Sequence, residues 1–330
     1  MTYSSGGLVQ STDYDGFVST TSGANINATW GTATTSGGYG QGNIAVVNTG
    51  DLVTATQWAT LNNTIAAAAN HNGTSITSRS SPTAGQTISV LSNINTDLTN
   101  IYNNRFNAAS TGTQVANWTG TTSKTGTTGS GASAWTITFT HTVTFANTTA
   151  LYSFFNAGGR ITIQYGKTST GTPADTEWNA FVGNGTANGK VGTLTHTGLA
   201  ASKTIASTSY TGLTKTGGTG TPTTLNTAIG VYALTGSNQV LYLQYDTGSP
   251  YTSNYVQTQA SISGSVITYT TTWYDAGDSN PGAGANISGG TAPSGATFGT
   301  APTTLVTYVP PETTYLTNSW GTPTVAATVA

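Results

Sequence analysis

The sequence has no cysteine and very few charged residues. Without cysteine, the chain cannot form a disulfide scaffold, a zinc finger, an iron–sulfur site or a thiol nucleophile. Eight Lys or Arg and ten Asp or Glu make up 5% of the 330 residues, whereas an ordinary domain has about 25%. The net charge of −2 excludes a basic nucleic-acid-binding protein and an acidic solvating tail. No apolar run approaches the roughly 20 residues of a membrane-spanning helix.

Threonine and glycine fill the place of the missing charges, with 73 and 42 residues respectively. Hydrophobic residues are 35% and aromatics 9% of the chain, which argues against disorder. Threonine is β-branched and favours strands, and glycine and asparagine favour tight turns. The composition therefore predicts a mainly β fold, a Thr/Gly-rich β-sandwich, with helices restricted to particular segments.

Residues 1–50 are expected to form an N-terminal arm with one short helix over 8–18, capped by Thr12 or Asp13. The first seven residues lack a basic region followed by an apolar stretch, so we expect no secretory signal. A protein of this composition would then leave the cell by lysis, as part of a virion does, or by an export route that needs no such signal.

Residues 51–108 predict an α-helical hairpin, which makes the fold α+β overall. Thr54 can cap the first helix, and the spacing of its apolar residues up to Ala68 follows one helical face. A second helix is expected over about 85–107. The opposite faces carry Asn, Thr and Ser, which reflects either a composition bias or a packed contact between subunits. The candidate contact residues are Trp58, Leu61, Ile65, Leu91, Leu98 and Trp320.

The rest of the chain divides into three parts. Residues 109–134 are a Gly/Thr/Ser connector, 135–310 a β-sandwich-like domain, and 311–330 an extended tail. The clearest period-2 alternation lies at 135–145. Further strands are expected at 160–165, 229–234, 239–245, 255–263, 266–274 and 305–309, and short helices at 147–155 and 174–182.

Catalytic residues are not predicted. The three histidines, His71, His141 and His196, have no acidic neighbour in sequence, and no Gly-x-Ser-x-Gly motif accompanies them. Asp13/Asp15, Asp175/Glu177 and Asp275/Asp278 are the closest acid pairs. Asp175/Glu177 can be interpreted as a glycosidase pair, but negative charge at a helix N-terminus is the better explanation. We expect no cofactor.

Two binding hypotheses remain. Asp275, Asp278 and Asn280 offer oxygen donors in a Gly-rich turn, as Ca²⁺ requires, although a plain Asx turn is the favoured interpretation and no metal is predicted. Tyr39, Tyr251 and Tyr255 can stack on sugars or fill the core of a sheet, and the core is favoured.

The missing charges also bear on assembly. Sheet proteins usually protect their edge strands with Lys, Pro or covering elements, and eight cations cannot protect this many strands. A weakly charged surface favours association. The expected partners are therefore other copies of the chain and other proteins of the same particle, with host surface glycans as a further possibility and no nucleic acid.

Four segments distributed along the chain resemble virion structural, tail-fibre-like proteins of marine tailed phages, of the type that infects cyanobacteria. They are Tyr3–Tyr14 (YSSGGLVQSTDY), Ala55–Leu61 (ATQWATL), Phe154–Gly159 (FFNAGG) and Pro311–Thr322 (PETTYLTNSWGT). The resemblance implies a place in a virion and supplies no site residue.

The first hypothesis is a non-enzymatic, self-associating phage structural protein, in a tail appendage, a fibre or a capsid decoration. The second is a carbohydrate-binding adhesin module. The third is a self-assembling extracellular filament or surface-layer protein unrelated to phage. An enzyme such as a glycan depolymerase comes last, because the chain offers few acid pairs.

Overall fold

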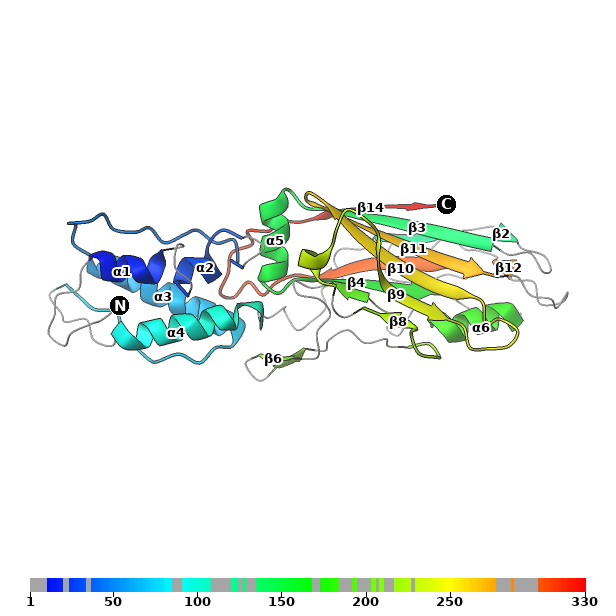
Figure 1. Cartoon of the computed structure of the whole chain (residues 1–330), viewed down its shortest axis with the longest axis horizontal. Helices are drawn as coiled ribbons and strands as arrows, with labels where there is room; N and C mark the ends of the chain where they lie inside the picture. The colour runs from blue at the N-terminus through cyan, green and yellow to red at the C-terminus, as the bar shows by residue number, and fades with distance from the viewer. Residues whose placement is uncertain are drawn as a thin grey trace.

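The structure is a computed structural model of the chain, in which helices gather at one end and strands at the other (Figure 1). It describes residues 11–19, 24–33, 37–84, 91–107, 120–123, 127–128, 135–167, 173–183, 192–194, 203–205, 208–210, 217–226, 229–276, 286–287 and 302–330.

The helical unit contains α1 (Ser11–Val18), α2 (Ile26–Trp30), α3 (Ala55–Asn72), α4 (Leu91–Asn103) and the 3-10 turn η1 (Arg105–Asn107). Apolar side chains spaced three and four residues apart on α3 and α4 form its core. The predicted pair of helices is therefore present, with α4 beginning at Leu91 and residues 85–90 outside the described part. Thr12 and Asp13 lie inside α1, so the predicted cap is wrong. The short helix α2 was not predicted.

Both ends of α3 are capped, and Thr54 caps the first as the sequence predicts. Thr54 accepts a hydrogen bond from the Gln57 backbone N–H, and the Gln57 side chain accepts one from the Thr54 N–H, which is a capping box. Gly73 ends the helix in the left-handed conformation, with φ 72°.

A six-stranded antiparallel sheet forms the larger β layer, in the order β14-β3-β11-β10-β9-β8. Alternation determines its faces: along β3, Ile137, Phe139, His141 and Val143 are buried, while the threonines between them face outward. The bounds are β3 Trp135–Thr144, β8 Thr224–Leu225, β9 Gln239–Tyr245, β10 Tyr255–Ser263, β11 Val266–Asp275 and β14 Thr324–Val329.

A smaller sheet has the order β1-β13-β4-β5, and two further strand pairs are short. Its central strands are β13 (Thr303–Val309) and β4 (Arg160–Gly166), flanked by β1 (Gly120–Ser123) and β5 (Gly192–Leu194). The remaining strands are β2 (Thr127–Thr128) with β12 (Asn286–Ile287), and β6 (Lys203–Ile205) with β7 (Thr208–Tyr210).

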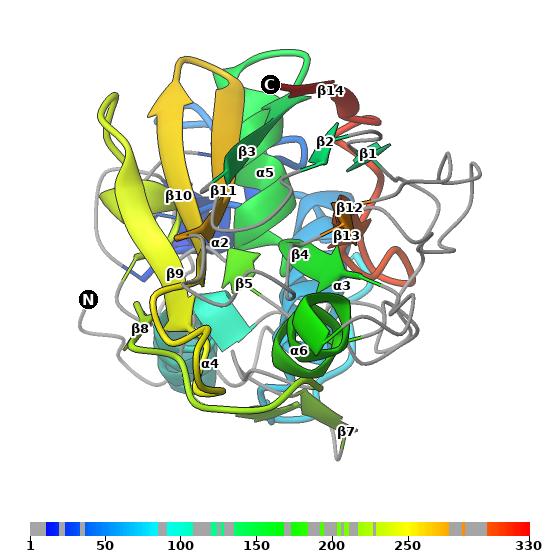
Figure 2. The ribbon, with the colours of Figure 1, turned by 90° about the vertical axis from the view of Figure 1, so that its right-hand side faces the viewer.

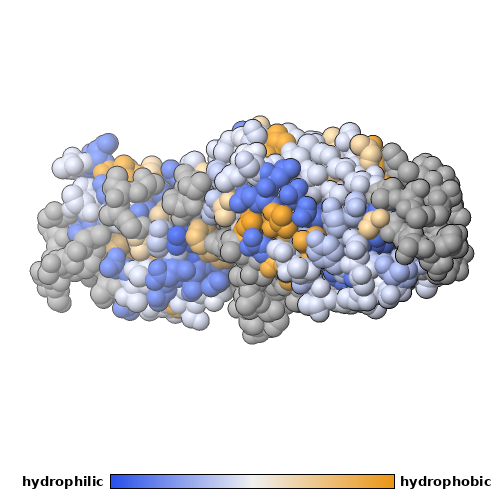
Figure 3. All heavy atoms as spheres, turned by 45° about the vertical axis from the view of Figure 1, so that its right-hand side comes forward, coloured by the Kyte–Doolittle hydropathy of each residue, from blue (hydrophilic) through white to orange (hydrophobic). Residues whose placement is uncertain are grey.

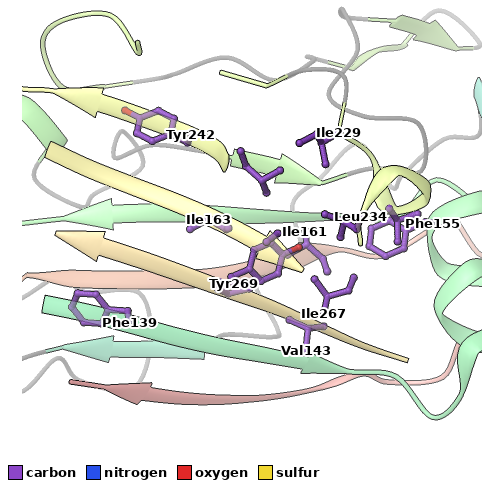
Figure 4. Close-up of a cluster of buried hydrophobic side chains, with 14 of the residues drawn as sticks. Phe139, Val143, Phe155, Ile161, Ile163, Ile229, Leu234, Tyr242, Ile267 and Tyr269 are labelled. Carbon is purple, nitrogen blue, oxygen red and sulfur yellow. The ribbon is translucent and has the colours of Figure 1, made fainter. Parts of the chain in front are cut away.

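Side chains from both larger sheets meet in one core. Phe139, Ile267 and Tyr269 come from the six-stranded sheet, and Ile161 and Ile163 come from β4 (Figure 4). The end view in Figure 2 shows the two layers of strands, with α6 toward the viewer and the helices of the helical unit behind. The structure is thus a mixed α+β fold with antiparallel sheets in its core; the sheets are unequal and do not make a clear sandwich.

Two helices complete the β part. Helix α5 (Thr148–Asn156), capped by Asn147, lies between the sheets and the helical unit, and α6 (Pro173–Val182) lies at the far end (Figure 1). Both were predicted. Residues 229–234, predicted as a strand, instead contain the 3-10 turn η2 (Val231–Ala233), so that prediction is wrong.

Polar contacts join the helical unit to the β part. His71 Nε2 lies 2.9 Å from the Ala157 carbonyl oxygen, and Asn156 donates to the Gly38 carbonyl. Gln41 binds the backbone of Thr317 in both directions, with an Nε2–O distance of 3.0 Å and an N–Oε1 distance of 2.9 Å. The predicted tail therefore lies on its own chain: residues 311–323 run past the junction and lead into β14.

None of the helices in the described part of the chain is long and apolar enough to cross a membrane.

Candidate functional site

The side chains predicted to contact other subunits are core residues of the chain itself. The exposed fraction is at most 2% for the side chains of Trp58, Leu61, Ile65, Leu98 and Trp320. The first four pack inside the helical unit, and Trp320 packs inside the β part. The prediction is wrong for these five, because neighbouring helices bury the first four and the β core buries Trp320. Leu91 opens α4, and its side chain lies outside the description.

The acidic residues singled out in the sequence have partners elsewhere in the fold where the structure describes them. The Asp15 carboxylate accepts a hydrogen bond from the Val47 N–H at 2.7 Å, which ties α1 to the following segment. Glu177 on α6 contacts a different acid, Asp246, which follows β9. The side chain of Asp175 and all of His196 lie outside the described residues.

The carboxylate of Asp275 is held inside the fold by hydrogen bonds. Its Oδ2 accepts hydrogen bonds from Trp178 Nε1 at 3.1 Å and from Asn254 Nδ2 at 3.2 Å. The other two residues of the calcium hypothesis, Asp278 and Asn280, lie outside the description. Among the residues that the structure does describe, no group of three His, Cys, Asp or Glu could hold a metal ion.

The contact between Glu177 and Asp246 is the most unusual polar arrangement in the β part. Asp246 is 3% exposed, and its Oδ1 accepts from the Gly248 N–H at 2.8 Å. Its Oδ2 is buried without a hydrogen-bond partner among the described residues. The Glu177 carboxylate lies against Gly248 so closely that a Cβ there would be 1.9 Å from Oε1, so a side chain at position 248 would have to displace this carboxylate.

Protonation of one of the two carboxyl groups removes the repulsion between Asp246 and Glu177. Burial, and the negative charge of Glu177 beside it, raise the pKa of Asp246 from 3.8 to about 7. One carboxyl group can then donate to the other, which satisfies Oδ2. Carboxyl groups in direct contact are too close to flank a glycosidic bond, which needs a separation of about 5–9 Å. The pair therefore joins α6 to the loop after β9 and has no geometry for glycoside hydrolysis.

Three tyrosines line the outer face of the large sheet at the end away from the helical unit. Tyr255 is directly opposite Tyr245 on one side and Tyr274 on the other. The rings of Tyr255 and Tyr274 stack with centroids 4.9 Å apart, and Tyr245, 40% exposed, meets Tyr255 at 60°. By contrast, Tyr39 and Tyr251 are buried, as the core interpretation predicts.

Threonine is the commonest residue on the rest of that outer face, which also carries Gln, Ser and a few apolar side chains. Thr138, Thr140 and Thr142 of β3 lie opposite Thr272, Thr270 and Thr268 of β11. None of the outward side chains on β3, β9, β10, β11 and β14 is charged, and the space-filling view shows a pale surface over much of the β part (Figure 3). This uncharged face ends at β14.

The chain was compared with protein-family models, curated proteins and solved structures. None matches. The function must therefore be argued from the chain's own residues.

Sequence reasoning missed Asp246 and β14 as functional candidates. Glu177 and Asp246 lie on different elements, and nothing in the local sequence links them. The Thr-Val-Ala-Ala-Thr-Val segment of β14 does carry a strand signal, because four of its six residues are β-branched.

Proposed function

We propose that this chain is a non-enzymatic structural protein of a phage virion, part of a tail appendage, a fibre or a capsid decoration, and that it associates with further copies of itself. The observation that carries the proposal is the uncharged outer face of the large sheet, which ends at β14. Such a surface has no charge repulsion that would prevent another copy from binding. The resemblance to virion proteins of marine phages supports the assignment of this chain to a phage particle. We include in the same proposal that the two sheets, which share a core, are arranged as a β-sandwich.

Sedimentation of the purified full-length chain over about 1–100 µM tests self-association, since dissociation constants of weak oligomers fall in this range. A discrete oligomer supports the proposal, and a monomer at every concentration contradicts it. Gold-labelled antibodies against the chain should then mark isolated phage particles at defined positions.

The filament or surface-layer alternative makes a different prediction for the same sample. Purified chain alone would then polymerise without limit, and electron microscopy would show fibres or sheets. A closed oligomer of fixed size contradicts this alternative.

The tyrosines favour a second candidate function, carbohydrate binding. Tyr245 offers a partly exposed ring, and the neighbouring Gln257 and Thr272 offer hydrogen-bonding groups on the same face. The support is narrower than for assembly, because the stacked rings of Tyr255 and Tyr274 cover one another's faces.

A glycan array tests this candidate. If the candidate is correct, a glycan that binds the wild-type chain should lose binding to Tyr245→Ala. Tyr315→Ala is the matched control, since Tyr315 is 41% exposed and lies outside the row. An array on which no glycan binds the wild-type chain, or an equal loss of glycan binding in both variants, contradicts carbohydrate binding through Tyr245, Tyr255 and Tyr274.

A further inference from the structure

The edge of the large sheet at β14 differs from its opposite edge. At the opposite edge, β8 has two residues, whereas β14 has six. Among the described strands, β14 pairs only with β3. Strand β1 of the smaller sheet lies nearby, but its backbone pairs with β13. One side of β14 therefore presents backbone groups that no described strand satisfies, which is a template for a further strand.

The hydrogen bonds between β14 and β3 show which backbone groups those are. Ala330 and Thr138 exchange two bonds, N to O at 3.0 Å and 2.9 Å, so they form a hydrogen-bonded pair. Such pairs alternate along antiparallel strands. Thr324, Ala326 and Thr328 therefore also point their N–H and C=O groups at β3. The backbone groups of Val325, Ala327 and Val329 point away from it.

We propose that β14 pairs antiparallel with β14 of a second copy, around a two-fold axis beside Ala327. This inference rests on the self-association proposed above and specifies its interface. In this register Ala327 faces Ala327, and Val325 faces Val329 of the other copy. All three outward-pointing residues then form hydrogen-bonded pairs, so the six outward backbone groups of each copy are satisfied.

The side-chain pattern agrees with this register. Directly opposite residues of an antiparallel pair lie on the same face, so a symmetric pairing must be centred on one residue. Centring on Ala326 would leave the groups of Val329 unpaired. Centring on Ala327 joins the half-buried valines on the core side and places Ala326 beside Thr328 on the outer side. The two sheets then continue as one.

The usual protections of a sheet edge are missing from this strand. Residues 313–330 contain no charged residue, and β14 contains no proline and pairs with β3 without a register shift. A second copy fits better than a charged partner, because nothing on the edge would recognise charge and the net charge of −2 repels a copy only weakly.

Proline substitution tests the edge selectively. In Ala327→Pro the missing N–H is one that points away from β3, so the fold should survive. The dissociation constant of the dimer should rise about 30-fold, since each copy loses one intermolecular hydrogen bond. Ala326→Pro is the contrasting variant: it removes an N–H bonded to β3 and should lower the melting temperature.

Cysteine cross-linking tests the register, since the chain has no other cysteine. In the proposed register the Cα atoms of the two residues 327 lie about 5.5 Å apart, which a disulfide spans. The two residues 326 lie diagonally, at about 7–8 Å, beyond that reach. Ala327→Cys should therefore form a covalent dimer under mild oxidation, and Ala326→Cys should not.

The outcomes separate this inference from the proposed function. A wild-type oligomer that dissociates in Ala327→Pro, with cross-linking at 327, supports the inference. If Ala327→Pro leaves the oligomer unchanged, pairing through β14 is overturned, and the chain self-associates through another surface. Cross-linking at 326 in place of 327 overturns the register. A monomeric wild-type chain overturns both proposals.

Discussion

Two buried polar groups of the β part carry a measurable cost at the scale of single residues. One is the Asp246 carboxyl beside Glu177, and the other is the hydroxyl of Tyr269, which is fully buried with no hydrogen-bond partner among the described residues. The Asp246 carboxyl is satisfied only while it shares a proton with Glu177, and the Tyr269 hydroxyl is unsatisfied at any pH. Removing either group should stabilise the fold wherever the group is unpaired.

The carboxyl pair predicts a pH dependence. The pKa of Asp246 is about 7 in the folded chain and near 3.8 when unfolded, so the folded state binds the extra proton between these values. The free energy of unfolding therefore falls as the pH rises through this window. Asp246→Asn should remove this slope and raise the melting temperature at pH 8. Thermal melts from pH 4.5 to 8 measure both.

Asp51→Asn is the matched control for that measurement, because Asp51 is exposed. Its melting profile should follow the wild type. Equal slopes in Asp246→Asn and the wild type would show that the carboxyl pair does not hold the proton.

The Tyr269 hydroxyl predicts a stabilising substitution. Tyr269→Phe removes a buried group without changing the packing of the ring, and stability should rise by about 1 kcal/mol. Tyr165→Phe should have the opposite effect, because the Tyr165 hydroxyl is hydrogen-bonded to Thr258. Urea denaturation of both variants tests the pair, and a loss of stability in Tyr269→Phe would contradict the prediction.

Among the elements, the strongly periodic ones were predictable. The alternation of β3, the apolar face of α3 and its Thr54 cap are local patterns, and the structure confirms each. The turn η2 was not predictable, because residues 229–234 have the apolar composition of a strand but are held by contacts from other elements: Val231 enters the β core and Tyr232 packs on Tyr152. The strand β14 pairs with β3, far away in sequence.

The α3 cap predicts a cost for its loss. Thr54→Ala removes the side-chain oxygen that binds the Gln57 N–H, and stability should fall by about 1 kcal/mol. Thr60→Ala is the control, since Thr60 is an exposed position inside the same helix where alanine is favourable. Chemical denaturation followed by circular dichroism measures both. Equal effects would mean that the box does not stabilise the helix.

Across the whole molecule, apolar burial and uncharged hydrogen bonds take the place of ion pairs. Arg79–Asp97 is a salt bridge between two described residues, and it is buried. Screening by salt weakens exposed charge pairs and affects buried ones much less. The small number of charged residues is visible in the sequence, but the junction at which Gln41 bonds to Thr317 is not.

This distribution predicts a stability that hardly depends on salt. The melting temperature should shift by less than about 2 °C between 0.05 and 0.5 M NaCl, because a chain with eight basic and ten acidic residues offers few charges to be screened. Differential scanning calorimetry at both concentrations measures the shift. A fall of more than about 5 °C would show that charges stabilise the fold more than the described contacts indicate.

The position of β14 along the chain has a consequence for the timing of folding. Synthesis runs from the N-terminus, so the edge of β3 that pairs with β14 stays unpaired until residues 324–329 have been made. The hydrogen bonds of Gln41 likewise form only after Thr317 has been made. One late segment thus closes the junction between the two parts and supplies the edge proposed to bind another copy. Until β14 has been made the chain lacks that edge, so newly made copies become competent to pair only after the segment that closes their own fold is present.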